Sequence, residues 1–357
     1  MPAMKRKYNC CFDIILALML ALFISPAYSR QKPVTKGIVQ RIKVHGKMLE
    51  GNLDGDSADR YVSVYLPASY NKDPKRRYPV IYFLHGYTDD DARFYGFKQH
   101  WMNLVPILDS VFAEGIAREM IVVTPNAYTR FQGSMYSNSA TTGNWEDFVA
   151  KELVFYIDSH YRTIARAKSR GLSGHSMGGY GTMRIGEKNP AVFSSIYMLS
   201  PCCLVSGTNT AQIPASYLRA DSIKTYEEFE KTDFGTKALF ASAAAWAPNP
   251  SNPPFYLDLP VKNGERQPLI EAKLAANRPM NTLDQYIFNL KKLRAIAFDA
   301  GTKDQAIAAS IKVLDAELNK YGVKHEFEIY EGTHTDHVAE RIEKKMLEFF
   351  SEHLSFK

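Results

Sequence analysis

Cysteine is scarce in this chain, and its pattern excludes several classes of protein. The 357 residues include four cysteines, and two of them, Cys10 and Cys11, fall in a segment that we expect to be removed. The other two, Cys202 and Cys203, are neighbours, which can bridge only with strain, so no disulfide framework is expected. Neither has metal-ligand partners at a useful spacing, and a packing role is the simplest interpretation.

Long runs of one charge sign are absent as well. The chain has 44 Lys and Arg against 38 Asp and Glu, a net charge of +6, and about +4 remains without residues 1–29. The charges are interspersed, and the short basic run at residues 75–77 is most simply a solvated turn before a strand. No nucleic-acid partner is therefore expected. The sequence also has no internal repeat and no low-complexity tract.

The N-terminal segment has the three parts of an export signal. Residues 5–7 are basic, residues 14–24 are apolar, and Ala27 and Ser29 place small residues where a signal peptidase reads them. The apolar run is too short for a comfortable membrane span. We predict a cleaved signal peptide over residues 1–29, a periplasmic or secreted protein, and no stable membrane association after cleavage. An uncleaved N-terminal anchor is the alternative.

The remaining residues, 30–357, have the pattern of one α/β domain. Apolar or alternating runs are followed by amphipathic, helix-like stretches, which is typical of a mostly parallel, doubly wound sheet. We expect strands over residues 37–49, 60–67, 78–84, 120–124, 168–173, 194–199, 294–298 and 324–330. We expect helices over residues 101–114, 145–161 (with Asn144 as N-cap), 177–187, 304–321 and 336–354.

The alternation loosens between residues 202 and 293. Short helical pieces are expected there over residues 225–231, 236–245, 269–276 and 283–292, with a tract rich in Pro and Asn at residues 248–254. No long apolar core pattern appears within this stretch. We therefore predict an insertion, between the sixth and seventh core strands and over the carboxyl edge of the sheet, that is not a separate domain.

The chain is organised around Gly174-His175-Ser176-Met177-Gly178, which fits the Gly-x-Ser-x-Gly nucleophile elbow. In this motif a strand turns sharply into a helix, with serine at the tip and a positive φ. Side chains two residues before and after the serine would collide, so glycine is needed there. A strand before Ser176 and a helix after it supply the confirming context, whereas a glycine-rich turn with a passive serine is the alternative.

A serine nucleophile needs a base, and the base needs a carboxylate to orient it. In this fold the order along the chain is Ser, then Asp or Glu, then His. The loop after residues 294–298 offers Asp304, with Asp299, closer to the strand end, as the alternative. The loop after residues 324–330 offers His334, with His337, expected inside the next helix, as the alternative. We predict Ser176, Asp304 and His334 as the catalytic residues.

Two backbone N–H groups are candidates for stabilising a developing oxyanion. The N–H of Met177 is free at the start of the helix after the serine. By analogy with other hydrolases that use this elbow, the second donor comes from the loop after the third strand, where His85, Gly86 and Tyr87 lie. We predict the N–H of Tyr87 as that donor and a structural role for His85.

These motifs together resemble a known family. The residues that carry the resemblance are Arg60 to Pro67, His85-Gly86-Tyr87, Asn144-Trp145-Glu146, Gly174 to Gly179, Gly301 to Asp304 and Gly332-Thr333-His334. They look like the esterase family of the α/β-hydrolases that includes esterase D (S-formylglutathione hydrolase), feruloyl, acetyl-xylan and enterochelin esterases, and mycolyltransferases of the antigen 85 type. The resemblance covers nearly all of residues 30–357, except that the insertion matches no member we can name.

The resemblance implies an α/β-hydrolase fold, no metal or organic cofactor, and the same three catalytic residues and two oxyanion donors. The expected function is an exported serine ester hydrolase that forms an acyl-enzyme on small-molecule or carbohydrate esters, including acetyl or feruloyl esters. One alternative is an acyltransferase that moves the acyl group to a sugar hydroxyl. Another is a non-catalytic binding module on the same scaffold.

Aromatic residues near the expected site are weaker candidates for substrate binding. The polar loop over residues 125–144 carries Tyr128, Phe131 and Tyr136, and the insertion carries Trp246, with Phe255 and Tyr256 nearby. Such rings can stack on a sugar or a phenolic group. Ordinary packing is the equal alternative. The sequence does not indicate an oligomeric state.

Overall fold

The structure of the chain, a computed structural model, describes residues 36–206 and 212–357. The predicted signal peptide, residues 1–29, lies outside the described residues. From Thr35 to Lys357 the chain forms one compact unit. Over the described ranges, no helix combines the length and the apolar character needed to span a bilayer.

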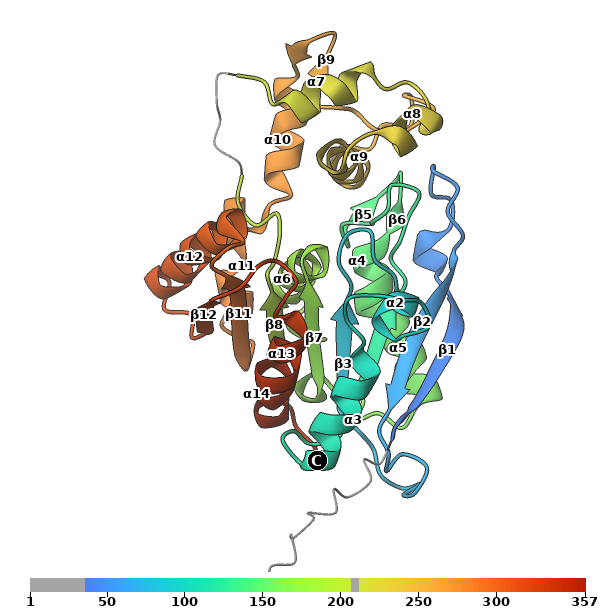
Figure 1. Ribbon diagram of the computed structural model, residues 1–357, viewed down its shortest axis with the longest axis vertical. Helices are drawn as coiled ribbons and strands as arrows, with labels where there is room; N and C mark the ends of the chain where they lie inside the picture. The colour runs from blue at the N-terminus through green and yellow to red at the C-terminus, as the bar shows by residue number, and fades with distance from the viewer. Residues whose placement is uncertain (1–35, 207–211) are drawn as a thin grey trace, which may run out of the picture. The chain divides into compact units, whose positions relative to one another are not determined.

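An eight-stranded sheet forms the centre of this unit (Figure 1). Its order is β1-β2-β4-β3-β7-β8-β11-β12. The pairs β1–β2 and β2–β4 are antiparallel, and every pair from β4 onwards is parallel. The strands are β1 Ile38–His45, β2 Asp59–Leu66, β3 Val80–Leu84, β4 Ile121–Pro125, β7 Arg170–His175, β8 Ser195–Leu199, β11 Ala295–Gly301 and β12 Glu326–Tyr330. The predicted mostly parallel sheet is confirmed.

The central strands are short apolar runs because both of their faces are covered. Every residue of β3, β4, β7 and β8 is buried. Side chains of consecutive strand residues point to opposite faces, so Ile81 and Phe83 contribute to one core, whereas Val80, Tyr82 and Leu84 contribute to the other. The carboxyl ends of these strands meet at one edge of the sheet, where ligands bind in open α/β sheets.

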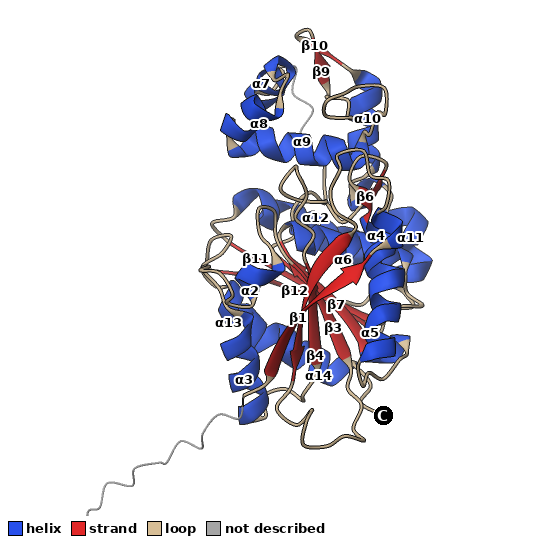
Figure 2. Ribbon diagram, turned by 90° about the vertical axis from the view of Figure 1, so that its right-hand side faces the viewer, coloured by secondary structure: helices blue, strands red, loops and turns tan. Residues whose placement is uncertain are grey.

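Helices pack on both faces of the sheet (Figure 2). Residues of α3, α13, η5 and α14 belong to the core on one face, and residues of η2, α5, α6 and α12 belong to the core on the other. These helices are α3 Leu104–Glu114, α4 Trp145–Asp147, η2 Phe148–Leu153, α5 Val154–His160, α6 Met177–Lys188, α12 Gln305–Lys320, α13 Val338–Arg341, η5 Ile342–Met346 and α14 Leu347–His353. Shorter elements are η1 Lys47–Leu49, α2 Asp91–Phe94, η3 Ala167–Ser169 and the pair β5 Asn138–Ser139 and β6 Gly143–Asn144.

Several local predictions need correction. The strand expected over residues 37–49 is β1, which ends at His45, and residues 47–49 form the 3-10 helix η1. The strand expected over residues 168–173 is β7, which continues to His175, directly before the serine. The helix expected over residues 145–161 contains a π-helical segment, η2, and the side chain of Asn144 does not cap it. Instead, Asn138 Oδ1 accepts a hydrogen bond from the N–H of Asp147 at 3.1 Å. The capping group therefore comes from the preceding β5 strand, which sequence proximity alone does not reveal.

The insertion lies between β8 and β11, the sixth and seventh core strands in chain order, as predicted. Its helices α7 to α10 lie beyond the carboxyl ends of the parallel strands (Figures 1 and 2). The helix α7 is not predicted by the sequence pattern. The elements are α7 Ala215–Ser222, α8 Tyr226–Lys231, α9 Phe234–Trp246, β9 Val261–Lys262, β10 Glu265–Arg266, α10 Pro268–Ala276, η4 Pro279–Asn281 and α11 Leu283–Leu290.

Candidate active site

Ser176 lies at the tip of a sharp turn between β7 and α6. Its φ of 57° is positive, as the motif predicts, and such a conformation typically costs about 1–3 kcal/mol. A Cβ on Gly178 would lie 1.9 Å from the carbonyl oxygen of Leu84, and a Cβ on Gly174 would lie 2.5 Å from the carbonyl oxygen of Gly178. The turn therefore requires glycine at both positions.

The side chains of Asp304 and His334 meet beyond the ends of β11 and β12. Asp304 Oδ2 lies 2.5 Å from His334 Nδ1. Asp304 directly precedes α12, but its carboxylate does not cap that helix and is bound to the imidazole instead. The side chain of His334 is 36% exposed and that of Asp304 is 15% exposed. The imidazole is thus the accessible member of a preformed acid–base pair.

Backbone contacts between two loops hold this pair together. The N–H of Lys303 donates to the carbonyl oxygen of Gly332 at 2.8 Å, and the N–H of Thr302 donates to that of Tyr330 at 2.7 Å. A Cβ on Gly301 would lie 2.2 Å from the carbonyl oxygen of Gly332. Glycine at position 301 therefore lets the loop that carries Asp304 pack directly on the loop that carries His334.

The alternative acid and base are bound elsewhere. The buried carboxylate of Asp299 accepts hydrogen bonds from Tyr197 Oη at 2.7 Å and Arg341 Nε at 2.8 Å. Burial raises the pKa of Asp299, although the Arg341 guanidinium opposes this shift. His337 lies just before α13, not inside it as expected, and its Nδ1 lies 2.8 Å from Glu340 Oε2. Asp299 is thus bound within the protein core, and His337 is bound to a residue of its own helix. The two alternative residues are not paired with each other, unlike Asp304 and His334.

His175, which the motif leaves unspecified, joins the serine turn to the His334 loop. Its Nε2 lies 2.9 Å from the carbonyl oxygen of His334, and the two ring centroids are 4.7 Å apart. Burial, together with the neighbouring His334 ring, lowers the pKa of His175 to about 4. A neutral His175 with its proton on Nε2 donates to that carbonyl at neutral pH. The residue just before Ser176 therefore positions the loop that carries His334.

The side chains of the two residues that carry the predicted oxyanion donors both pack against Gly133. A Cβ on Gly133 would lie 2.6 Å from Met177 Sδ and 2.7 Å from Tyr87 Cδ2. Among the described residues, neither the N–H of Tyr87 nor that of Met177 has a hydrogen-bond acceptor. His85 is buried, with Nδ1 2.8 Å from the carbonyl oxygen of Gly86, and its Nε2 accepts from the N–H of Ala127 at 2.8 Å. These contacts fit the structural role predicted for His85.

Three of the four aromatic candidates for substrate binding are buried. Phe131 and Tyr136 have no exposed surface, and Trp246 is 4% exposed. Phe131 packs among rings from the insertion, and Trp246 Nε1 donates to Ser137 Oγ at 3.1 Å. Only Tyr128 of the four is substantially exposed, at 37%. The structure therefore favours the packing alternative for Phe131, Tyr136 and Trp246, because a covered ring cannot stack on a substrate.

The surroundings of the site offer no arrangement of metal ligands within the part of the chain that the structure describes. Cys202 and Cys203 are free and partly exposed. The N–H of Cys202 donates to the carbonyl oxygen of Ser176 at 3.1 Å, so the loop after β8 also supports the serine turn. No motif in the sequence indicates this contact.

Several known proteins are similar to this chain. An esterase of Mycobacterium tuberculosis is 25% identical over 284 residues, which are 76% of this chain and 52% of that protein. The chain thus spans about half the length of that relative. The S-formylglutathione hydrolase of Arabidopsis thaliana is 26% identical over 226 residues, 59% of this chain and 77% of that protein.

Solved structures of a ferulic acid esterase and of an S-formylglutathione hydrolase have a similar fold. A ferulic acid esterase superposes with a TM-score of 0.61 at 20% identity, covering 90% of this chain and 100% of that one. The S-formylglutathione hydrolase of Agrobacterium tumefaciens gives 0.57 at 16% identity, covering 91% and 98%. The fold is that of an α/β-hydrolase. Residues 57–339 match the family model described as "Putative esterase", and the chain therefore belongs to this esterase family.

Proposed function

We propose that the protein is a serine carboxylic-ester hydrolase that works through an acyl-enzyme formed on Ser176. The observation that carries this proposal is the hydrogen bond between Asp304 and His334, with His334 on a loop whose backbone contacts the residue preceding the serine. A strained serine, a preformed acid–base pair and two N–H groups without acceptors are the parts that acyl transfer requires.

In the proposed mechanism, His334 takes the proton of Ser176 Oγ as this oxygen attacks the ester carbonyl carbon. Asp304 keeps the proton of His334 on Nδ1, so that Nε2 is the base. The N–H groups of Tyr87 and Met177 donate to the oxyanion, and losing one such donor typically costs about 3 kcal/mol of transition-state stabilisation. His334 then protonates the departing alcohol, and a water molecule, activated by the same base, releases the acid.

The substrate class is proposed from the relatives. One solved relative, a ferulic acid esterase of Anaeromyces mucronatus, has ferulic acid bound, and the feruloyl esterase module of Clostridium thermocellum has sinapinate bound. We propose acyl esters of carbohydrates or similar small molecules, including acetyl and feruloyl esters. The basic and apolar segments of residues 1–29 support export to the periplasm or the medium. No role for a cofactor, a nucleic acid or a stable membrane contact is proposed.

The test is the Ser176→Ala variant assayed with p-nitrophenyl acetate. We expect activity to fall by at least about 10³-fold, since the nucleophile and its base act as a unit. A fluorophosphonate probe should label the wild-type protein and not the variant. Ser159, exposed on α5, provides the matched control: Ser159→Ala should retain both activity and labelling.

Two results would contradict the proposal. Most of the activity surviving in Ser176→Ala would exclude this serine as the nucleophile. No labelling of the folded wild-type protein would favour a non-catalytic binding module. Product analysis with an added sugar, such as trehalose, separates hydrolysis from acyl transfer, because only a transferase makes the sugar ester in place of the free acid.

A further inference from the structure

Two exposed aromatic rings contact different residues of the candidate active site. Phe234, the first residue of α9, is 66% exposed, and Trp101, in the loop before α3, is 44% exposed. Exposed apolar rings are common on protein surfaces, and these two are singled out because each packs against a residue of the candidate site. Neither ring was among the aromatic candidates from the sequence, which came from residues 125–144 and from Trp246, Phe255 and Tyr256 of the insertion.

Phe234 covers the side chain of one oxyanion donor. Its ring packs edge to face on Tyr87, with centroids 5.5 Å apart. Tyr87 is fixed from the other end because its hydroxyl donates to the carbonyl oxygen of Phe131 at 3.0 Å. The start of α9 is also fixed, since Asp233 Oδ1 accepts from the N–H of Thr236 at 3.1 Å and Asp233 pairs with Arg219. One face of Phe234 is thus anchored while most of its surface stays open.

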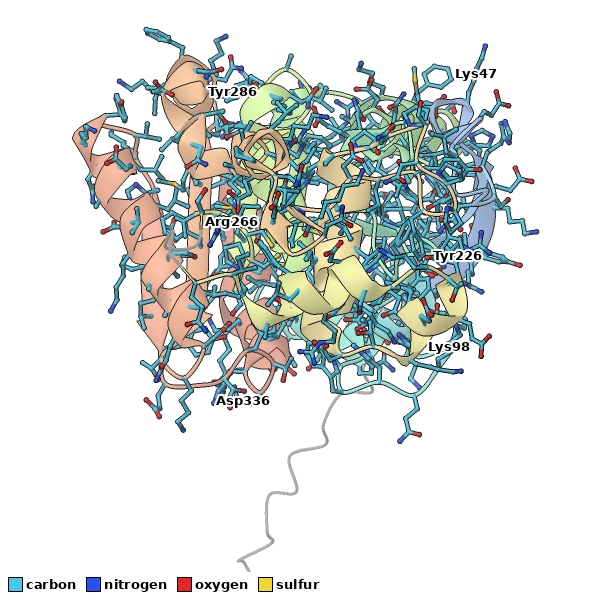
Figure 3. The ribbon with its side chains drawn as sticks, turned by 90° about the horizontal axis from the view of Figure 1, so that it is seen from above. Lys47, Lys98, Tyr226, Arg266, Tyr286 and Asp336 are labelled. Atoms are coloured by element: carbon cyan, nitrogen blue, oxygen red, sulfur yellow. The ribbon has the colours of Figure 1, made fainter. Side chains whose placement is uncertain are left out.

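Trp101 lies on the side of the general base. Its ring centroid is 5.5 Å from that of His175, which in turn is 4.7 Å from that of His334. Phe94 and His100 pack against the same indole. In Figure 3, seen from above, Lys98 in the loop that leads to Trp101 and Asp336 in the loop after His334 lie toward the same lower side of the view.

We propose that Phe234 and Trp101 form two apolar walls of the substrate site and favour esters that carry an aromatic group. The inference rests on the proposed function. His334 must protonate the departing alcohol, so the alcohol part lies beside His334, on the side of Trp101. The acyl part extends the other way, past Tyr87, toward Phe234. Phe234 therefore contacts the acyl group, and Trp101 contacts the alcohol.

The test compares kcat/KM of variants with four esters: methyl acetate, methyl cinnamate, phenyl acetate and 1-naphthyl acetate. The ratio of variant to wild type is taken for each ester, so intrinsic differences in ester reactivity cancel. Loss of one ring contact should lower the ratio about tenfold. We expect this loss with methyl cinnamate for Phe234→Ala, and with 1-naphthyl acetate for Trp101→Ala. Methyl acetate carries no ring, so the loss with each aromatic ester is measured relative to the change that the same variant shows with methyl acetate.

Control variants separate a direct contact from a general disturbance. Phe288 on α11 is 80% exposed, and Phe288→Ala should leave all four ratios near one. Phe234→Tyr and Trp101→Phe keep a ring and should restore most of the lost selectivity. Because Phe234 is largely exposed, thermal unfolding of Phe234→Ala should match that of the wild-type protein within a few degrees. Trp101 packs against three rings, so Trp101→Phe is the variant that separates its contact with the substrate from its contribution to stability.

An equal loss with all four esters, no loss with any, or an exchange of the two effects would overturn the inference. Failure of the proposed function is a different result. In that case the wild-type protein hydrolyses none of the esters, or Ser176→Ala hydrolyses them equally well. A wild-type enzyme that depends on Ser176 but shows no ring-dependent selectivity leaves the hydrolase proposal standing and removes only the two walls.

Discussion

Asp299 and Asp304 belong to the same stretch of chain, but their surroundings assign them different tasks. Asp299 is completely buried and bound to the side chains of Tyr197 and Arg341. Asp304 is partly exposed, and its carboxylate is bound to the imidazole of His334. A buried, paired carboxylate supports the fold, whereas a carboxylate on an accessible imidazole can set its tautomer. These two residues therefore provide a matched test of the candidate site.

We expect Asp304→Asn to lower kcat by about 10²- to 10⁴-fold with little change in stability, because the imidazole loses the group that orients its proton. Asp299→Asn should instead lower the stability of the protein with little change in kcat. It weakens a buried ion pair with Arg341, so the free energy of unfolding should fall by about 2–3 kcal/mol. Steady-state kinetics and urea unfolding of both variants measure the two effects. A large loss of kcat confined to Asp299→Asn would assign the acid to position 299 instead.

At the scale of elements, the helix after the serine carries an unusual buried acid. Glu187, near the end of α6, is 2% exposed, and its Oε2 has no hydrogen-bond partner among the described residues. Burial raises the pKa of Glu187 to about 8, although Lys188 and Arg184 oppose the shift. The carboxyl is therefore protonated in the folded protein at neutral pH, whereas an exposed glutamate is ionised.

This shift makes stability fall as the pH rises. Between the ordinary glutamate pKa of 4.5 and the folded value of about 8, the unfolded chain releases the proton and the folded chain keeps it. The unfolded state then binds fewer protons, so the free energy of unfolding decreases across this window. At about 1.4 kcal/mol per pH unit over this window, the decrease is on the order of 5 kcal/mol.

Glutamine cannot ionise, so Glu187→Gln should remove this slope. Urea unfolding at pH 5 and pH 8 measures it: the variant should gain stability relative to wild type between the two pH values. Glu352 on α14 is exposed, and Glu352→Gln should keep the wild-type slope. The prediction would be contradicted if the free energy of unfolding changed with pH by the same amount in the wild-type protein and in Glu187→Gln.

The elements that position the site were predictable because local patterns define them. The apolar run of β3 and the glycine pattern around Ser176 can be read directly from the sequence, whereas the need for glycine at position 301 comes from a contact with Gly332 on another loop. His175 and Cys202 were missed because their roles depend on backbone carbonyls of distant or neighbouring loops. Aromatic residues were the least predictable. Burial of Phe131 depends on rings from the insertion, whose partners no sequence period reveals.

At the scale of the whole molecule, the insertion shares a core with the sheet. Phe131, from the loop between β4 and β5, stacks on Phe240 of α9 with centroids 6.4 Å apart. Phe240 also packs on Phe229 at 5.3 Å and on Phe255 at 4.9 Å, both from the insertion. These rings belong to the same hydrophobic cluster as Val80 of β3. A shared core predicts that the insertion and the sheet unfold together.

Phe240→Ala tests this coupling, because Phe240 has no exposed surface. Truncating a buried phenylalanine typically costs about 3–5 kcal/mol. If the core is shared, the variant should unfold at a lower temperature in one transition, and near-ultraviolet circular dichroism and loss of esterase activity should follow the same curve. Phe288 is exposed, so Phe288→Ala should change neither the unfolding temperature nor the esterase activity. If the insertion were an independent domain, Phe240→Ala would split the curve, with an early transition from the insertion and an unshifted one from the sheet.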